Sequence, residues 1–423
     1  METIRNKGYS RNGLIILCSM VYFVSYFSRK DFAVVMAGMI SEGVIGRANA
    51  GLVGTMLFIF YGVGQLISGY LGDKIKPKYL IIAGLSVTAF CNALMPIIPG
   101  GAMIAVWGLN GLAQAMLWPP IVKILSQYLD HKTYVTANLV VTSAAHVATI
   151  LLYVFVPICL SFMSWRSVFF TASALAIASV ITFAVAMRII LPKEAEAVPV
   201  LSKKAVVSGE KTAEVNIFKL LRESGVFTVF ICIVVIGFLR DGIESWMPML
   251  YSEAFGRDVS ESTLVSMILP IFSIVSISVV SALHKKGVLR NEVSGAGVFF
   301  ALSLVCAVPL VFFVAMDGMF FGILALFLTA FICGAMHCAN FLLISCLPGR
   351  FASTGRAATV SGVCNSCVYI GAAISTYGIA LISEKMGWSV TVGTWCVILL
   401  VGIAFAALSY KRYKSMLDAK TEE

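Results

Sequence analysis

Charged residues are scarce in this sequence. Asp, Glu, Lys and Arg make up 12% of its 423 residues, about half the share found in an ordinary soluble domain. Apolar residues make up 59%, and the mean hydropathy is +0.94. This composition excludes a soluble enzyme and a disordered chain. Divided into apolar runs of about 20 residues with short connections, the chain is long enough for about twelve membrane crossings.

The polar connections also lack cysteine. All eleven cysteines lie inside apolar stretches, where neither a disulfide framework nor a loop zinc site is expected. The basic opening segment precedes an apolar run that is too long for a signal peptide and has no cleavage site, so we expect the first span to be retained. There is no G-x-x-x-x-G-K-[S/T] phosphate loop, and we therefore expect no ATP-driven transport by this chain. We also expect no cofactor and no metal.

Apolar runs bounded by turn and charge signals predict an all-α integral membrane protein with twelve transmembrane helices. A polar segment, 192–223, separates an N-terminal six-helix half, 1–191, from a C-terminal six-helix half, 224–423. The tail of that segment, NIFKLLRES, is amphipathic and suited to the membrane surface. The spans are expected near residues 13–40, 49–71, 78–98, 102–128, 134–160, 167–191, 224–252, 260–283, 294–314, 318–345, 355–381 and 389–410.

Basic residues fall mainly in alternate loops. Of the 31 Lys and Arg, about 23 lie in the N-terminus, the even-to-odd loops and the C-terminus, and by the positive-inside rule these regions are cytoplasmic. The net charge of +10 therefore reflects membrane topology, expected in a bacterial inner membrane, and no nucleic-acid partner is expected. Inside the spans lie Arg29, Lys123 and Arg240. Five residues fall on the other side: Lys30, Arg47, Arg166, Arg257 and Lys385.

The two halves read as an internal repeat. An offset of 211 residues carries Phe27 onto Phe238, Arg29 onto Arg240 and Lys74 onto Lys285. Parallel six-helix halves that meet at a site near the bilayer midplane are the architecture of one large class of secondary transporters. We therefore expect pseudo-symmetric halves that rock against each other.

Arg29 and Arg240 are each surrounded by apolar residues deep in a span. An intramembrane charge costs at least about 2.5 to 3.5 kcal/mol and usually faces a functional cavity. Two equivalent arginines facing one cavity would form a clamp for a divalent anion, because the guanidinium fork binds phosphate or carboxylate bidentately. The alternative is that each arginine pairs with an acid on its own helix. Glu244 is correctly spaced for Arg240, whereas Asp31 lies on the wrong face for Arg29.

Tyr22 and Tyr26 precede Arg29 by seven and three residues. This spacing puts two phenol hydroxyls and a guanidinium on one helix face. Tyrosine can donate to a phosphate oxygen while its ring lines an apolar wall. The alternative, packing between helices with satisfied hydroxyls, stays open for each tyrosine alone.

Several motifs carry a family resemblance. Residues 69–78, GYLGDKIKPK, with Gly69, Asp73 and Lys74, resemble the short cytoplasmic loop signature of the major facilitator superfamily. The segments YFSRKDFAVVM, GLAQAMLWPPIVKILS, SAAHVA, FLRDGIESWMPML and AATVSGVCNSCVYIGAAIS resemble those of the organophosphate:phosphate antiporter family. The resemblance runs through both halves.

That resemblance implies roles for particular residues. Arg29 and Arg240 would clamp the phosphate. Gln65 stands where glycerol phosphate carriers of the family tend to have lysine, and His337 has no counterpart, so we interpret it as a packing residue. Trp118-Pro119-Pro120 is interpreted as a kink. The further substrate-contact candidates are Tyr22, Tyr26, His146 and Tyr369, and the candidates for charge pairs or gating are Lys30, Asp241 and Glu244.

The function implied is exchange of an organic phosphate ester, of the glycerol phosphate or sugar phosphate class, for inorganic phosphate by alternating access. One alternative is an organic-acid or sugar-acid symporter in which Asp241, Glu244 or His146 carries the coupling proton. Another is a sugar-phosphate sensor that signals through a partner membrane protein. In each case we expect a monomer in lipid whose ligands are small anions.

Overall fold

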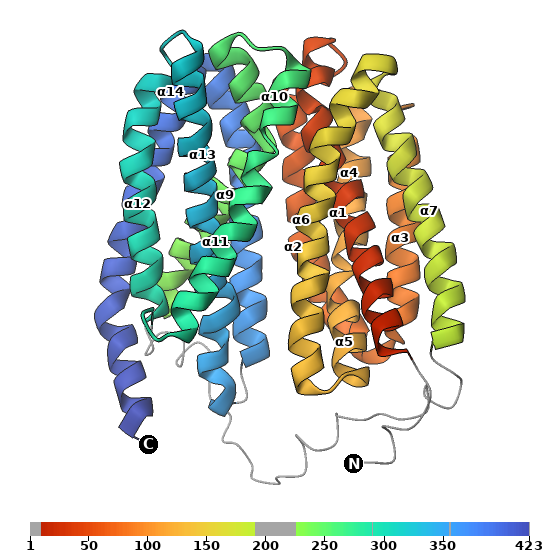
Figure 1. Ribbon diagram of the computed structural model, residues 1–423, viewed down its shortest axis with the longest axis vertical. Helices are drawn as coiled ribbons and strands as arrows, with labels where there is room; N and C mark the ends of the chain where they lie inside the picture. Colours follow the sequence, from red (N-terminus) through yellow and green to blue (C-terminus); the bar gives the residue numbers. More distant parts are fainter. Residues whose placement is uncertain (1–9, 191–225, 290, 355–356, 423) are drawn as a thin grey trace.

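The computed structural model describes residues 10–190, 226–289, 291–354 and 357–422, and these residues are almost entirely helical, with no strand among them (Figure 1). The predicted amphipathic stretch NIFKLLRES and the rest of segment 192–223 lie outside the described residues. The helices stand roughly parallel in two groups, one from each half of the chain.

The N-terminal half contains seven helical pieces. Ser10 caps the first by accepting a hydrogen bond from the Gly13 amide, Asp130 caps α6 in the same way at the Thr133 amide, and proline stands in the first turn of α3 and α5. These are the residues that helix starts favour. The pieces are α1 (Arg11–Ser41), α2 (Arg47–Lys74), α3 (Pro77–Leu94), α4 (Gly100–Ala115), α5 (Trp118–Tyr128), α6 (His131–Phe162) and α7 (Trp165–Ile190).

The C-terminal half has a similar organisation. Its α14 contains two helices joined at Gly387, whose φ of 81° is a left-handed value that glycine tolerates. Its pieces are α9 (Val226–Phe255), α10 (Val259–Val265), α11 (Ile268–Lys285), α12 (Glu292–Phe313), α13 (Met319–Asn340), the π-helical turn η2 (Phe341–Cys346), the 3₁₀ segment η3 (Leu347–Thr354) and α14 (Ala357–Glu422).

Ten stretches of the described chain are long and apolar enough to cross a membrane. One of them, Val360–Met416, holds the two helices joined at Gly387, and α9 adds a helix of 30 residues. The structure is therefore consistent with twelve crossings. It confirms the predicted all-α membrane fold.

Two local predictions have different outcomes. The fourth span breaks into α4 and α5 directly before Trp118, as expected of a kink at consecutive prolines. The prediction that residues 69–78 form a turn is wrong, because Gly69, Asp73 and Lys74 belong to the last turns of α2. Only residues 75 and 76 join α2 to α3, since proline at the first position of α3 can begin the next helix at once.

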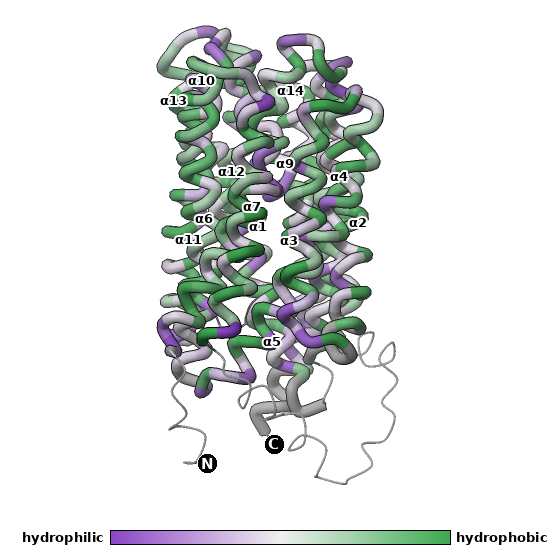
Figure 2. Tube along the Cα trace, turned by 90° about the vertical axis from the view of Figure 1, so that its right-hand side faces the viewer, coloured by the Kyte–Doolittle hydropathy of each residue, from purple (hydrophilic) through white to green (hydrophobic). Residues whose placement is uncertain are grey.

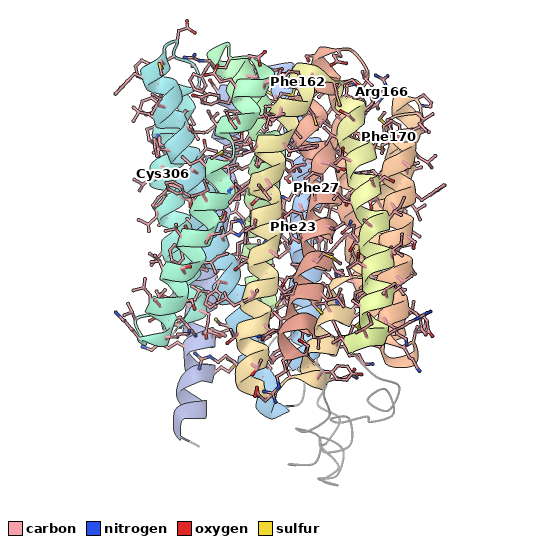
Figure 3. All side chains as sticks on the ribbon, turned by 45° about the vertical axis from the view of Figure 1, so that its right-hand side comes forward. Phe23, Phe27, Phe162, Arg166, Phe170 and Cys306 are labelled. Carbon is pink, nitrogen blue, oxygen red and sulfur yellow. The ribbon has the colours of Figure 1, made fainter. Side chains whose placement is uncertain are left out.

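The surface has the polarity expected of a protein in lipid. Hydrophilic residues gather toward the two ends of the molecule and hydrophobic residues dominate the length between them (Figure 2). Large apolar side chains also stand on the outside, among them Phe162, 84% exposed, and Phe170, 48% exposed (Figure 3). In water such a surface would be an interaction patch, whereas in a bilayer it faces hydrocarbon.

The halves meet along α2 and α14. A Cβ on Gly51 of α2 would stand 2.7 Å from the Ala380 Cβ of α14, so the two backbones approach closely here. The Thr55 hydroxyl donates to the Ala373 carbonyl oxygen at 2.8 Å. Small residues and side-chain hydrogen bonds are the usual means of packing helices where lipid replaces water.

Candidate functional site

A cavity of about 750 Å³ lies between the two halves. Its wall comes from α1, α2, α4, α5 and α6 of the N-terminal half and from α9, α11, α13, η2 and α14 of the C-terminal half. This volume is within the range of about 300 to 1,000 Å³ typical of small-molecule sites. Its position at the interface of the repeats is where a transporter of this architecture binds its substrate.

Arg29 lines the cavity from α1 and is 8% exposed. Its guanidinium carbon lies 4.1 Å from the ring centroid of Tyr26 and 5.0 Å from that of Tyr61. Within the described residues it has no carboxylate partner. Asp31, as the helical spacing predicts, turns away from it and is fully buried, with its Oδ1 accepting a hydrogen bond from the Phe32 amide at 2.8 Å. Arg29 is therefore a cation held by aromatic faces.

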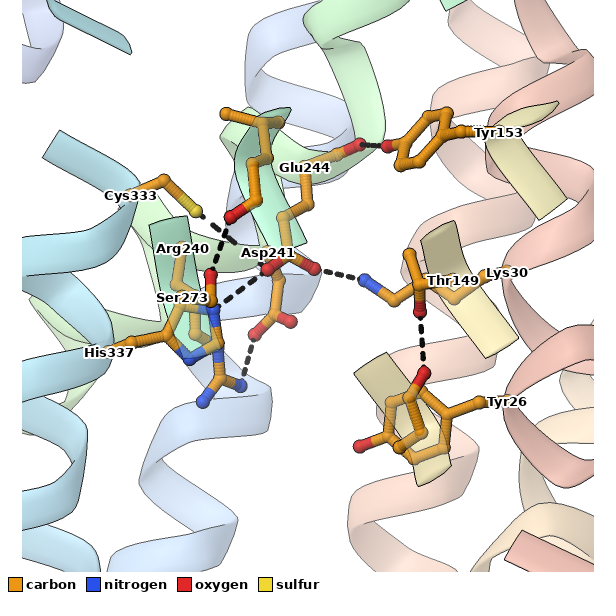
Figure 4. Close-up of polar contacts among 12 residues, drawn as sticks. Tyr26, Lys30, Thr149, Tyr153, Arg240, Asp241, Glu244, Ser273, Cys333 and His337 are labelled. Atoms are coloured by element: carbon orange, nitrogen blue, oxygen red, sulfur yellow. Dashed lines mark hydrogen bonds and ion pairs between the residues drawn. The ribbon is translucent and has the colours of Figure 1, made fainter. Parts of the chain in front are cut away.

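Arg240 lines the same cavity from α9. Its Nη2 lies 2.7 Å from Asp241 Oδ2, and its Nη1 donates to Asn340 Oδ1 at 2.8 Å (Figure 4). Arg240 therefore pairs with an acid on its own helix, as the alternative predicted, but that acid is Asp241 and not Glu244. The two arginines thus share a cavity, but Arg240 has a neutralising neighbour and Arg29 has none in the described chain.

Glu244 instead connects the two halves. Its Oε2 forms an ion pair with Lys30 of α1, and its Oε1 lies 2.9 Å from His337 Nε2 of α13. Its backbone carbonyl accepts a hydrogen bond from the Tyr153 hydroxyl at 3.1 Å. One prediction is wrong: Lys30 lies within α1 and not in a loop, with its side chain 15% exposed. His337 is buried as a packing residue, as predicted, and is in addition a polar contact of the cavity wall.

Aromatic side chains cover much of the wall. The rings of Tyr22 and Tyr26 are 5.0 Å apart at their centroids, and Trp118 lies 4.7 Å from Tyr22. Tyr369, from the opposite half, lies 4.6 Å from Tyr61. Sequence reasoning missed Tyr61 and interpreted Trp118 only as part of a kink, although an aromatic residue beside a proline break could have been a signal.

The remaining candidates divide between the cavity and the helix ends. Gln65 and His146 line the cavity, and the His146 ring lies 5.8 Å from that of His337. Lys285, the repeat counterpart of Lys74, also lines the cavity, whereas Gly69, Asp73 and Lys74 belong to the last turns of α2. The predicted contact residues that line the cavity are Tyr22, Tyr26, Arg29, Gln65, His146, Arg240 and Tyr369, together with Lys30, Asp241 and Glu244.

The formal charge of the cavity wall is positive. Among the lining residues that the structure describes, cationic side chains exceed carboxylates by two, with histidine counted as neutral. A dianion would neutralise this excess, so the wall suits a ligand such as a phosphate monoester. The positively charged lining residues are Arg29, Lys30, Arg240 and Lys285, and the negatively charged ones are Asp241 and Glu244.

The two ends of the cavity differ. At the end opposite the chain termini (Figure 1), Arg47 of α2 pairs with Glu253 of α9 and lies 3.4 Å from the Ser383 hydroxyl. The Trp388 indole N–H donates to the other carboxylate oxygen of Glu253 at 2.7 Å. We call these four residues the latch. At the terminal end, the cavity is lined by residues as far along as Lys285, at the end of α11, so it reaches that side.

Sequence comparison agrees with this architecture. The family description "Major Facilitator Superfamily" matches residues 18–376. The chain belongs to this superfamily. It is accordingly a multi-pass membrane protein of this superfamily, as predicted.

Comparison with individual proteins shows which members of the superfamily this chain resembles. A probable hexose phosphate transport protein of Chlamydia muridarum is 28% identical over 35% of this chain and 33% of its own length. The membrane sensor protein UhpC of Escherichia coli K12 is 23% identical over 61% of each chain, and the glycerol-3-phosphate transporter of Bacillus subtilis is 25% identical over 56% of each. The chain thus spans between a third and about three fifths of these relatives. The predicted resemblance to the organophosphate:phosphate antiporter family is confirmed.

Solved structures share the fold. A bacterial homolog of the human lysosomal transporter Spinster superposes with a TM-score of 0.78 over 96% of this chain and 98% of its own, at 15% identity. A mutant of peptide transporter POT in complex with sulfate gives a TM-score of 0.71 over 95% of each chain, at 12% identity. At sequence identities of 15% and 12%, these similarities show a shared fold and no more.

Proposed function

We propose that this protein exchanges an organic phosphate ester for inorganic phosphate by alternating access in a bacterial cell membrane, with both termini cytoplasmic. The observation that carries the proposal is that Arg29 and Arg240, one from the equivalent position of each half, line a single cavity. Relatives named as hexose phosphate and glycerol-3-phosphate transport proteins support the same substrate class.

Electrostatics gives a reason for obligatory exchange. Closing the cavity without a ligand would remove Arg29 and the other excess positive charge from water without compensation, which is costly. A phosphate group carrying about −1.5 to −2 charges at neutral pH offsets that excess. The loaded protein can then rock between its two open states, while the empty protein cannot.

The wall suggests how the two parts of the substrate are divided. The phosphate is bound between Arg29 and Arg240, where planar guanidinium groups can bind oxygens in pairs. The organic part faces Tyr22, Tyr26 and Trp118, whose rings offer apolar surface while the tyrosine hydroxyls offer hydrogen bonds. Small phosphate esters of sugars or glycerol fit this combination.

The test is phosphate exchange by the full chain in vesicles loaded with inorganic phosphate. We expect uptake of labelled phosphate, and expect Arg29→Lys and Arg240→Lys each to lower it at least about tenfold, since lysine keeps the charge but loses the bidentate geometry. Arg257→Lys is the matched control, because within the described chain the ion-pair partner of Arg257 is Glu261, which belongs to the same half. Normal exchange by both cavity variants would disprove the proposal.

The same vesicles separate the other functions. The relative named a membrane sensor protein matches 61% of this chain, more than the two transport proteins described above. Binding of phosphate esters without any counterflow would favour a sensor function. Uptake of an organic acid driven by a proton gradient, and insensitive to phosphate inside the vesicle, would favour a proton symporter. A thermal-shift panel of phosphate esters and organic acids on purified protein would identify the organic part.

A further inference from the structure

Three metal-ligating side chains converge on the C-terminal wall of the cavity. Cys333 and His337 are four residues apart on α13 and so project from the same face. Glu244 reaches them from α9, with its Oε1 2.9 Å from His337 Nε2 and 3.8 Å from Cys333 Sγ. The potential ligand atoms all lie within 4.8 Å of one another. Figure 4 shows the three side chains approaching a common point.

Two of the three separations between these atoms are close to those of a metal site. Zinc binds sulfur at about 2.3 Å and nitrogen or oxygen at about 2.0 to 2.2 Å, so ligands at tetrahedral angles stand roughly 3.3 to 3.6 Å apart. The separations from Glu244 to His337 and Cys333 bracket those values. One thiolate, one imidazole and one carboxylate form a ligand set that favours a borderline divalent ion over Mg²⁺ or Ca²⁺.

We propose that Glu244, Cys333 and His337 bind one divalent transition metal of the Zn²⁺ class, with the fourth position open to the cavity. This site shares Glu244 and the cavity with the proposed phosphate site, but the proposal does not rest on phosphate exchange. On binding, the Cys333 thiol gives its proton to cavity water, and the thiolate and carboxylate balance the two positive charges of the ion. His337 binds through Nε2 as a neutral ring. The charges of the ion and its two anionic ligands then sum to zero, and Lys30 beside Glu244 keeps one positive charge.

The surroundings support this arrangement. Lys30 contacts the other oxygen of Glu244, Oε2, so the ion pair orients the carboxylate and leaves Oε1 for the metal. Glu244 and His337 line the cavity and give an ion access, while Cys333 lies fully buried behind them. Across the cavity, the ring of His146 lies 5.8 Å from that of His337, which brings a further nitrogen donor from the other half near the open position.

Cobalt is a suitable probe, because a thiolate bound to Co²⁺ produces an intense near-ultraviolet charge-transfer band. We expect the chelator-treated full chain in detergent to bind one Co²⁺ with such a band, and added Zn²⁺ to remove it. Cys333→Ser should abolish the band. His337→Gln, which retains the thiol, should weaken Co²⁺ binding at least tenfold.

A control is needed because all eleven cysteines are free thiols. Cys338→Ser is matched, since Cys338 lies five residues further along α13 and its Sγ contacts the Ser276 carbonyl oxygen at 3.3 Å. We expect this variant to keep the band and the affinity. Absence of a band in the unchanged protein, or a band that survives Cys333→Ser, would overturn the proposal. If Cys333→Ser does not fold, unchanged Co²⁺ affinity in His337→Gln overturns it equally.

Discussion

Replacing Glu253 with glutamine is expected to open the end of the protein opposite the chain termini. Glu253 is the centre of the latch. It accepts from Arg47 of the N-terminal half through one carboxylate oxygen and from the Trp388 indole through the other, at 2.7 Å. Glutamine has nearly the same shape but carries no charge, so the substitution tests the electrostatic contribution without leaving a cavity.

The expected magnitude follows from exposure. The Arg47 and Glu253 side chains are 14% and 35% exposed, so their ion pair contributes about 1 kcal/mol or less. Neutralising the acceptor also weakens the Trp388 bond from the charged class, about 1.5 to 3 kcal/mol, to the neutral class, about 0.5 to 1.5 kcal/mol. The total is about 1 to 2 kcal/mol. Since each 1.4 kcal/mol is a factor of ten, the equilibrium should shift roughly 5- to 30-fold toward opening at this end.

Hydrogen–deuterium exchange measures the shift. In Glu253→Gln we expect faster exchange in segments 42–50 and 384–390, which flank the latch, and slower exchange in segments lining the terminal end of the cavity. Arg47→Gln should act in the same direction. The double variant should show less than the sum of both effects, because the two residues lose one shared interaction.

Arg257→Gln is the control for this experiment. Its partner, Glu261, lies in the same half, at 3.7 Å, and both side chains are more exposed. It should leave the exchange at both ends unchanged. Equal effects of Glu253→Gln and Arg257→Gln, or no effect of either, would refute the assignment of the latch to this equilibrium.

Two substitutions test packing and burial through the melting temperature. Gly237→Ala should strongly lower the melting temperature, because the added Cβ would stand 2.0 Å from the backbone oxygen of Val368. Gly378→Ala should leave it unchanged, because there is open space around Gly378. Equal melting temperatures of the two variants would contradict this reasoning. Arg350→Gln should lower the free energy of unfolding by about 1 to 3 kcal/mol, because Arg350 Nη2 lies 2.7 Å from the carboxylate of the fully buried Glu292. An unchanged melting temperature would show that this ion pair does not contribute to stability.

The sequence alone was enough to predict that the protein lies in lipid and that its fold is all-α. Long apolar runs must be helices in lipid, because every backbone polar group has to be satisfied within its own segment. Because a charge inside such an apolar run is costly, Arg29 and Arg240 could be recognised as functional candidates from the sequence. The repeat offset of 211 residues showed that they occupy equivalent positions in the two halves. The spacing of Tyr22, Tyr26 and Arg29 predicted one face because helix geometry is local, and that face lines the cavity.

Only the tertiary structure decided which polar groups meet between helices. Glu244 pairs with Lys30, 214 residues away, and with His337, 93 residues away. Arg47 meets Glu253 across 206 residues. Such pairs depend on the rotation of each helix about its axis and on where the halves close. Lipid-facing residues are apolar around most of the helix surface, so the sequence pattern does not fix that rotation, and close packing between backbones does.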